Sequence, residues 1–63
     1  MPIVQIEMFE GRTIEQKREM VKEVTRSLVR TVNCQPEAVK IVIREIKKEN
    51  LAEDGMLYCD RES

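Results

Sequence analysis

Apolar and polar residues alternate at the start of the chain. The alternation divides residues 2–9 into two faces, Val4, Ile6 and Met8 on one and Ile3, Gln5, Glu7 and Phe9 on the other. A period of two is that of a β-strand, and a proline is tolerated at a strand's first position. The pattern predicts a strand over 2–9, ended by residues 10–12, where Gly11 can adopt a positive φ.

A helical period follows this break. Thr13 and Gln16 have the spacing of a capping box, in which each side chain satisfies a backbone amide at the helix start. Apolar residues then recur on one face: Ile14, Val21, Val24, Leu28 and Val32, widened by Met20 and Val29. On the polar face we expect two ion pairs, Glu19 with Lys22 and Glu23 with Arg26. The pattern predicts a helix over 13–32, closed by Asn33 in a left-handed conformation and by Pro36.

Alternation returns over residues 39–46 and predicts a second strand. Its two faces carry Val39, Ile41 and Ile43, and Lys40, Val42, Arg44 and Ile46. A polar connection over 47–54, a turn at Gly55, a short third strand over 56–59 and a frayed tail over 60–63 complete the expectation. The fold class is α/β (α+β): a βαβ unit of two parallel strands and one long helix, plus a short C-terminal hairpin or strand, in one domain over 1–63.

The length of the chain predicts that it assembles. At 63 residues a single core rarely supplies more than about 3–5 kcal/mol, and Cys34 and Cys59 have the spacing of neither a disulfide framework nor a zinc site. The sheet face away from the helix would carry Ile3, Phe9, Val42 and Ile46, a partly apolar surface suited to burial against another subunit.

Composition excludes several functions. The chain has no histidine, which removes the usual general base and histidine-bound zinc. Lys and Arg total 11 against 12 Asp and Glu, giving a net charge of −1, so we expect no nucleic-acid partner. No apolar run is long enough for a membrane span, and no signal peptide is visible, so we expect no membrane partner and a cytoplasmic location. The acidic residues lack calcium-loop spacing, and we expect no metal.

The start of the chain offers a different base. Removal of Met1 would leave Pro2 with a free secondary amine, and an α-amino group titrates near about 7.7–8. A site of low polarity with neighbouring cations lowers that pKa further. Such an amine can take a proton from one atom of a substrate and return it to another.

Residues 2–6 (PIVQI), 10–13 (EGRT) and 15–17 (EQK) closely resemble the opening of the 4-oxalocrotonate tautomerase family, and the resemblance continues through the helix, Pro36, the second strand and Gly55. It implies a homo-oligomer, a hexamer built as a trimer of dimers, with active sites shared between subunits. It also implies enol–keto tautomerisation of small anionic 2-hydroxy or 2-oxo acids such as 2-hydroxymuconate in aromatic catabolism, with no organic cofactor.

The resemblance assigns roles to five residues. Pro2 falls on the catalytic proline, Arg12 on the arginine that binds the distal carboxylate, and Phe9 on a position that lines the pocket from an adjacent subunit. Lys40 stands where the family usually has an arginine that polarises the 2-hydroxy or carbonyl oxygen. Leu51 stands where the family usually has an aromatic residue that keeps the proline pocket dry.

Other readings of these residues stay open. Without the resemblance, Arg12 reads as a solvated loop arginine, Lys40 as an exposed strand lysine and Phe9 as packing. Lysine keeps the charge of arginine but not its planar fork, and the acidic residues at 53 and 54 would raise the pKa of the amine if they bordered the pocket.

The alternative function is a non-catalytic or repurposed oligomeric binding protein of the same fold. A retained Met1 would make the Pro2 nitrogen a non-basic amide and block the amine. An interaction domain unrelated to tautomerases is a third possibility.

Overall fold

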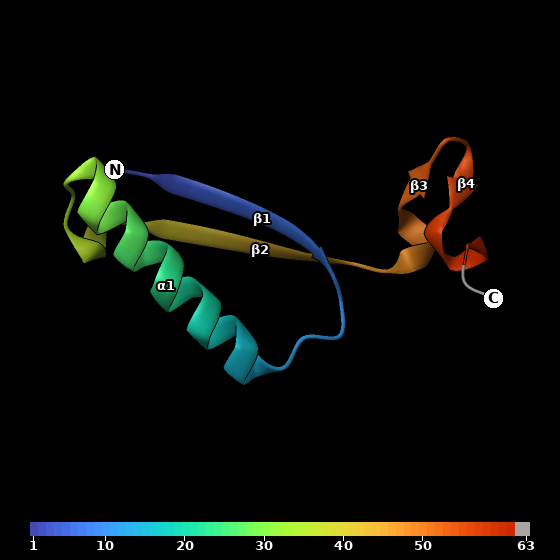
Figure 1. Ribbon diagram of the computed structural model, residues 1–63, viewed down its shortest axis with the longest axis horizontal. Coiled ribbons are helices and arrows are strands. Elements are labelled where there is room, and N and C mark those ends of the chain that lie inside the picture. Colours follow the sequence, from blue (N-terminus) through green and yellow to red (C-terminus); the bar gives the residue numbers. More distant parts are fainter. Residues whose placement is uncertain (62–63) are drawn as a thin grey trace.

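The computed structural model describes residues 1–61, and its elements follow the predicted order (Figure 1). The strands are β1 (Ile3–Phe9), β2 (Lys40–Ile46), β3 (Ala52–Glu53) and β4 (Met56–Leu57), and the long helix is α1 (Ile14–Val32). Single turns of 3₁₀-helix occupy Pro36–Ala38, Lys48–Asn50 and Tyr58–Asp60. The βαβ unit predicted from the sequence is confirmed.

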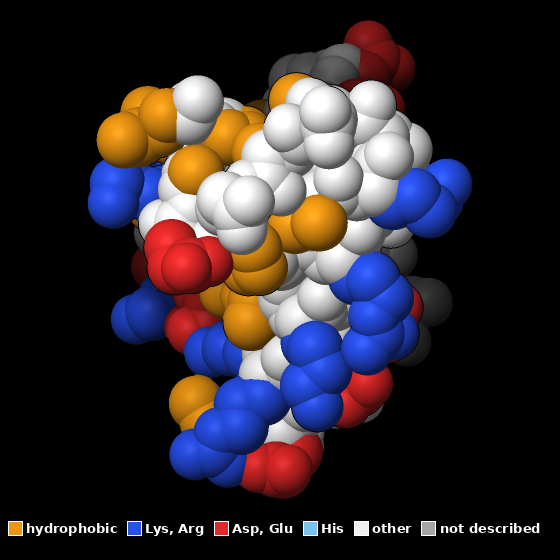
Figure 2. Space-filling model, turned by 90° about the vertical axis from the view of Figure 1, so that its left-hand side faces the viewer, with side chains coloured by type: hydrophobic (Ala, Val, Ile, Leu, Met, Phe, Trp, Pro, Cys, Tyr) orange, Lys and Arg blue, Asp and Glu red, His pale blue; other side chains and the backbone are white. Residues whose placement is uncertain are grey.

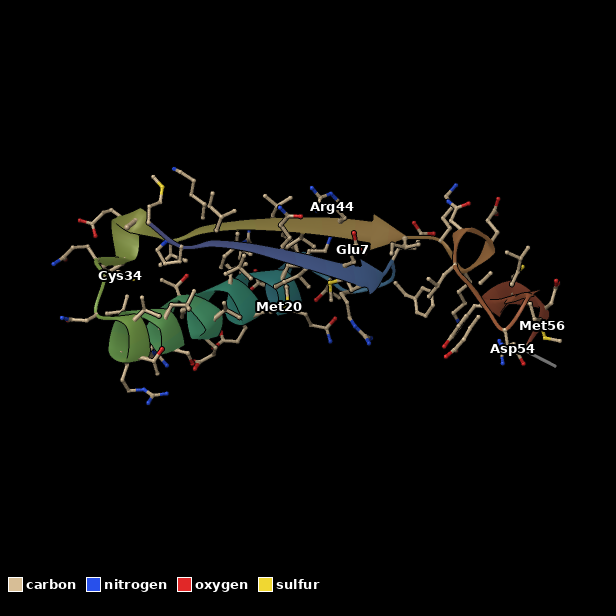
Figure 3. The ribbon with its side chains drawn as sticks, turned by 90° about the horizontal axis from the view of Figure 1, so that it is seen from above. Glu7, Met20, Cys34, Arg44, Asp54 and Met56 are labelled. Carbon is tan, nitrogen blue, oxygen red and sulfur yellow. The ribbon has the colours of Figure 1, made fainter. Side chains whose placement is uncertain are left out.

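β1 and β2 form a parallel ladder that runs in register from Ile3 with Lys40 to Phe9 with Ile46. Helix α1 covers one face of this ladder and leaves the other open (Figure 3). Val4, Ile6 and Met8 on the helix side are half-buried, as predicted. On the open face Ile3 remains 62% exposed and Val42 41% exposed, so one chain alone leaves much of its apolar sheet surface in water.

The predicted capping box starts α1. The Thr13 amide donates to Gln16 Oε1 at 2.9 Å, and the Gln16 amide donates to Thr13 Oγ1 at 3.1 Å. Asn33 closes the helix with a φ of 63°, the left-handed conformation expected of a C-terminal cap. The predicted ion pairs are present, Glu19 with Lys22 at 3.9 Å and Glu23 with Arg26 at 2.6 Å. Local spacing therefore sets both ends of the helix.

The two ends of the predicted apolar stripe remain uncovered. Ile14 is 60% exposed and Val32 55% exposed, although both belong to the helical period. A helix of 19 residues is about 28 Å long, whereas strands of seven residues span about 23 Å. The helix also runs obliquely to the strands (Figure 1), so the sheet of one chain leaves its terminal apolar residues largely uncovered.

The C-terminal segment corrects three sequence expectations. The connection over 47–54 contains β3, which pairs antiparallel with β4, and the predicted strand over 56–59 stops at Leu57 because a 3₁₀ turn begins at Tyr58. That turn includes Asp60, so the frayed tail predicted over 60–63 is wrong at its start; residues 62–63 lie outside the described part. Asp54 and Gly55, with φ of 55° and 75°, form the two-residue turn of this hairpin.

No residue of the described chain is fully buried. The radius of gyration is 15.1 Å, against about 11 Å for a compact domain of this length, because the β3–β4 hairpin projects beyond the end of the sheet (Figure 1). Figure 2, which views the end that carries the N-terminus, shows apolar side chains gathered on the surface beside Lys and Arg side chains. The fold exposes apolar surface that only further contacts could cover.

Candidate active site

Pro2 and Lys40 lie together at one end of the sheet. The Lys40 amide donates to the Pro2 carbonyl at 3.0 Å, and the ladder pairs Lys40 with Ile3. Pro2 is half-buried, whereas Lys40 is exposed. Within residues 1–61 no ion pair or side-chain hydrogen bond engages the Lys40 ammonium, so this cation is available to an anionic ligand.

Arg12 lies in the loop between β1 and α1, where Gly11 takes a φ of 121°. It lines a cavity of about 210 Å³ together with Met8, Gln16, Lys17 and Met20. The labelled Met20 side chain projects from α1 toward the sheet (Figure 3).

Two other polar groups of this cavity are already engaged. Lys17 forms an ion pair with Glu45 of β2 at 2.8 Å, and Gln16 belongs to the capping box. No ion pair engages Arg12 among the described residues. Its guanidinium is therefore the unpaired cation of this cavity, and its fork suits a carboxylate.

Phe9 and Leu51 lie near each other, at the end of β1 away from Pro2. The Phe9 ring packs on Tyr58, with ring centroids 5.2 Å apart, and the Tyr58 amide donates to the Leu51 carbonyl at 2.9 Å. The Lys48 ammonium lies 6.0 Å from the Phe9 ring centroid. Leu51 itself is 37% exposed. At this end the rings of Phe9 and Tyr58 pack together, and Phe9 lines a pocket whose other walls include the charged side chains of Glu10, Lys47, Lys48 and Glu49.

The five predicted site residues therefore fall into two groups. Pro2 and Lys40 are at one end of the sheet, and Phe9, Arg12 and Leu51 are toward the other. The six residue steps from Ile3 to Phe9 span about 20 Å, too far for one small substrate to bridge. One chain does not bring all five together.

Sequence reasoning missed the interactions around Tyr58. Its hydroxyl donates to Glu53 Oε1 at 2.8 Å, and the Arg61 guanidinium lies 5.4 Å from its ring centroid while also donating to the Glu53 carbonyl. Bonding and charge from Glu53 raise the pKa of Tyr58 above its ordinary value of 10.0, so the phenol stays protonated at neutral pH. The acidic side chain at position 53 thus has a partner of its own.

Two further residues of possible chemistry are free thiols, Cys34 and Cys59. Cys34 follows α1 (Figure 3), and Cys59 lies in the 3₁₀ turn Tyr58–Asp60. Desolvation, followed by the carboxylate of Asp60, raises the pKa of the Cys59 thiol. A raised pKa reduces the thiolate fraction and with it the nucleophilicity of the sulfur.

Within residues 1–61 no three His, Cys, Asp or Glu side chains are grouped as metal ligands would be. In the same residues no helix has the length and apolarity to cross a membrane.

The class of protein follows from the fold and its family pattern. A family model described as "Tautomerase enzyme" matches residues 2–58. The chain belongs to the tautomerase family.

Individual relatives agree with this assignment over nearly the whole chain. A 2-hydroxymuconate tautomerase of Bacillus subtilis is 39% identical over 62 residues, 98% of this chain and 100% of the relative. A probable tautomerase of Staphylococcus epidermidis is 36% identical over 61 residues, 97% of this chain and 100% of the relative.

Solved structures match the fold equally well. One, from work on the 4-oxalocrotonate tautomerase isozymes of Methylibium petroleiphilum, superposes with a TM-score of 0.92 at 39% identity and covers 97% of this chain and 95% of its own. The structure of YwhB, a homologue of 4-oxalocrotonate tautomerase, gives a TM-score of 0.89 at 37% identity, covering 94% and 97%. The tautomerase fold expected from the sequence is confirmed.

Proposed function

We propose that this chain is a tautomerase that interconverts the enol and keto forms of a small 2-hydroxy-dienoate such as 2-hydroxymuconate. The observation that carries the proposal is the position of Lys40, an unpaired cation among the described residues, next to Pro2 at the end of the parallel ladder. Membership of the tautomerase family and the name of the Bacillus subtilis relative support the reaction and the substrate class.

The proposed base is the secondary amine of Pro2 after removal of Met1. Neutral Pro2 takes the proton of the substrate's 2-hydroxyl group, and the released electron pair forms the keto C=O bond. The shift of the conjugated double bonds makes a distant carbon basic, and the Pro2 ammonium returns the proton there. Proton and electrons balance within the substrate, so the cycle needs no cofactor.

Two cations hold the substrate in this scheme. The Lys40 ammonium stabilises the negative charge that develops on the 2-oxygen, as an oxyanion-stabilising group does. Arg12 binds the distal carboxylate through its planar fork. Phe9 and Leu51 provide the apolar wall that excludes water and keeps the pKa of the Pro2 amine low.

The site is proposed to be shared between subunits of a homo-oligomer, a hexamer arranged as a trimer of dimers. The distance between the Pro2 and Arg12 ends of one chain supports sharing, because assembly is the way to bring these ends together. The absence of any fully buried residue in the described chain supports assembly itself. We propose a cytoplasmic location for this oligomer, as expected from the sequence.

Replacing Pro2 by Ala tests the proposal. We expect Pro2→Ala to slow ketonisation of 2-hydroxymuconate by at least about 100-fold, because a positioned general base contributes about 10²–10⁴ to rate. The assay follows loss of the dienol absorbance, with intact mass measured on the same preparations. Wild-type turnover by a Pro2→Ala protein that lacks Met1 would refute the proline mechanism.

Intact mass also distinguishes the proposed tautomerase from the alternative, a non-catalytic binding protein. A wild-type protein from its native cells that keeps Met1 has an amide at Pro2 and no basic nitrogen there. That result would favour the non-catalytic binding protein and contradict the proposed base.

A further inference from the structure

The C-terminal segment meets the end of β1 at the Phe9 ring, which lies against both Tyr58 and Lys48. Between residues 47 and 61 every residue is exposed except Tyr58, which is half-buried. The labelled Asp54 and Met56 lie in the outer part of the projecting hairpin (Figure 3). The hairpin therefore has little packing of its own that would fix its direction relative to the sheet.

Tyr58 joins the two candidate wall residues at this end, Phe9 through its ring and Leu51 through its backbone. Its ring packs on Phe9 with centroids 5.2 Å apart and planes tilted by 49°. Its amide donates to the Leu51 carbonyl at 2.9 Å, which extends the β3–β4 ladder by one residue beyond the pair of Ala52 and Leu57. One residue thus joins the candidate wall residue of β1 to that of the hairpin.

The other contacts of Tyr58 restrict its rotation. The hydroxyl donates to Glu53 at 2.8 Å, and Arg61 lies over the ring with its Cζ 5.4 Å from the centroid. Arg61 also donates to the Glu53 carbonyl, so β3 and the last turn hold the ring from two sides. A ring held in this way makes apolar contact with Phe9 and also fixes the direction of the hairpin relative to the sheet.

We propose that Tyr58 is a positioning residue that directs Leu51 into the apolar wall around the Pro2 amine. The inference rests on the proposed function, since it gives Leu51 its role. When Leu51 is displaced, water enters the pocket and the protonated form of the Pro2 amine is favoured.

The experiment compares Tyr58→Ala, Tyr58→Phe and Tyr58→Leu with the matched truncation Met56→Ala, which lies in the same hairpin and is 46% exposed. Three quantities are measured on each protein: native mass, hydrogen exchange of the amides of residues 52–58, and the pH profile of kcat/KM for 2-hydroxymuconate. Pro2→Ala is measured beside them.

For Tyr58→Ala we expect faster exchange over 52–58 and a loss in kcat/KM of roughly tenfold. We also expect the acid limb of its pH profile to move up by about one pH unit, because the wetter amine binds its proton more tightly. Tyr58→Phe keeps the ring, so the acid limb of its pH profile should lie at the wild-type pH. Met56→Ala should match the wild type in all three measurements. Where Tyr58→Ala does not assemble, Tyr58→Leu carries the same expectations.

Two results would overturn the proposal. If hydrogen exchange is faster in Tyr58→Ala but the acid limb of the pH profile and kcat/KM are unchanged, Tyr58 only stabilises the hairpin. If hydrogen exchange is unchanged, Tyr58 does not position the hairpin. In both cases a slow Pro2→Ala protein leaves the proline mechanism intact. Wild-type turnover by Pro2→Ala would instead remove the proposed function, and the role of Tyr58 in the site with it.

Discussion

At the scale of single residues, the chain has no histidine, and the base that we propose is the Pro2 amine. Apolar surroundings and neighbouring cations would favour the neutral form of this amine, and the Lys40 backbone amide donates to the Pro2 carbonyl. At position 40, where the family resemblance implies an arginine, lysine keeps a point charge without a bidentate fork. We expect lysine in place of arginine to change the substrate preference.

Local spacing predicted some residue contacts and could not predict others. Thr13 and Gln16 are three positions apart, so their reciprocal hydrogen bonds follow from helix geometry alone. The contact of Tyr58 with Phe9 joins residues far apart in the sequence, and no periodic pattern marks it. The Lys17–Glu45 pair was missed for the same reason.

The single tyrosine permits a direct titration. Hydrogen bonding and charge from Glu53 raise the Tyr58 pKa above 10.0, so we expect Glu53→Gln, which removes the charge, to lower the midpoint of tyrosinate formation in ultraviolet absorbance. The folded-state pKa is raised; the stability that this contact contributes is therefore present below the unfolded pKa and lost as pH rises through the folded value. Hairpin amides should lose protection over that alkaline range.

Asp54→Asn provides the control, because it changes the neighbouring carboxylate without touching the hydrogen bond to Tyr58. An equal midpoint in the wild type and Glu53→Gln would contradict the assigned cause of the shift.

At the scale of elements, the sequence predicted the βαβ unit because its strands and helix are long enough to show a period. The strands β3 and β4 have two residues each, too few for any alternation. The turn between them is an Asp-Gly pair, a strong hairpin signal when long alternating runs flank it, but here those runs are missing. The sequence therefore predicts a short C-terminal hairpin or strand but does not place the first strand of the hairpin within residues 47–54.

Helix α1 provides the prediction at this scale. Thr13→Ala removes the hydroxyl that accepts from the Gln16 amide, and we expect it to lower the free energy of unfolding by about 1 kcal/mol. Chemical denaturation at one fixed protein concentration measures this, because assembly links stability to concentration. Thr13→Ser keeps the acceptor and should stay close to the wild type; equal losses in both variants would show that the cap is not the cause.

At the scale of the whole molecule, one chain alone neither forms a buried core from its described residues nor brings its candidate site residues together. It has no fully buried residue among those described, it exposes the open face of its sheet, and its hairpin extends away from the body (Figure 1). Its candidate site residues lie about 20 Å apart in two groups. The proposed oligomer, in which the Pro2 end of one chain meets the Arg12 end of another, would explain these features together.

Co-refolding of two inactive variants tests this shared site most directly. Pro2→Ala and Arg12→Ala proteins are unfolded, mixed in equal amounts and refolded together, with separately refolded proteins mixed afterwards as the control and native mass confirming assembly. If Pro2 and Arg12 of one site come from different chains, random assembly gives about a quarter of the sites both residues intact, and about that fraction of wild-type 2-hydroxymuconate turnover should return. Co-refolded oligomers that remain as inactive as their parents would contradict the account.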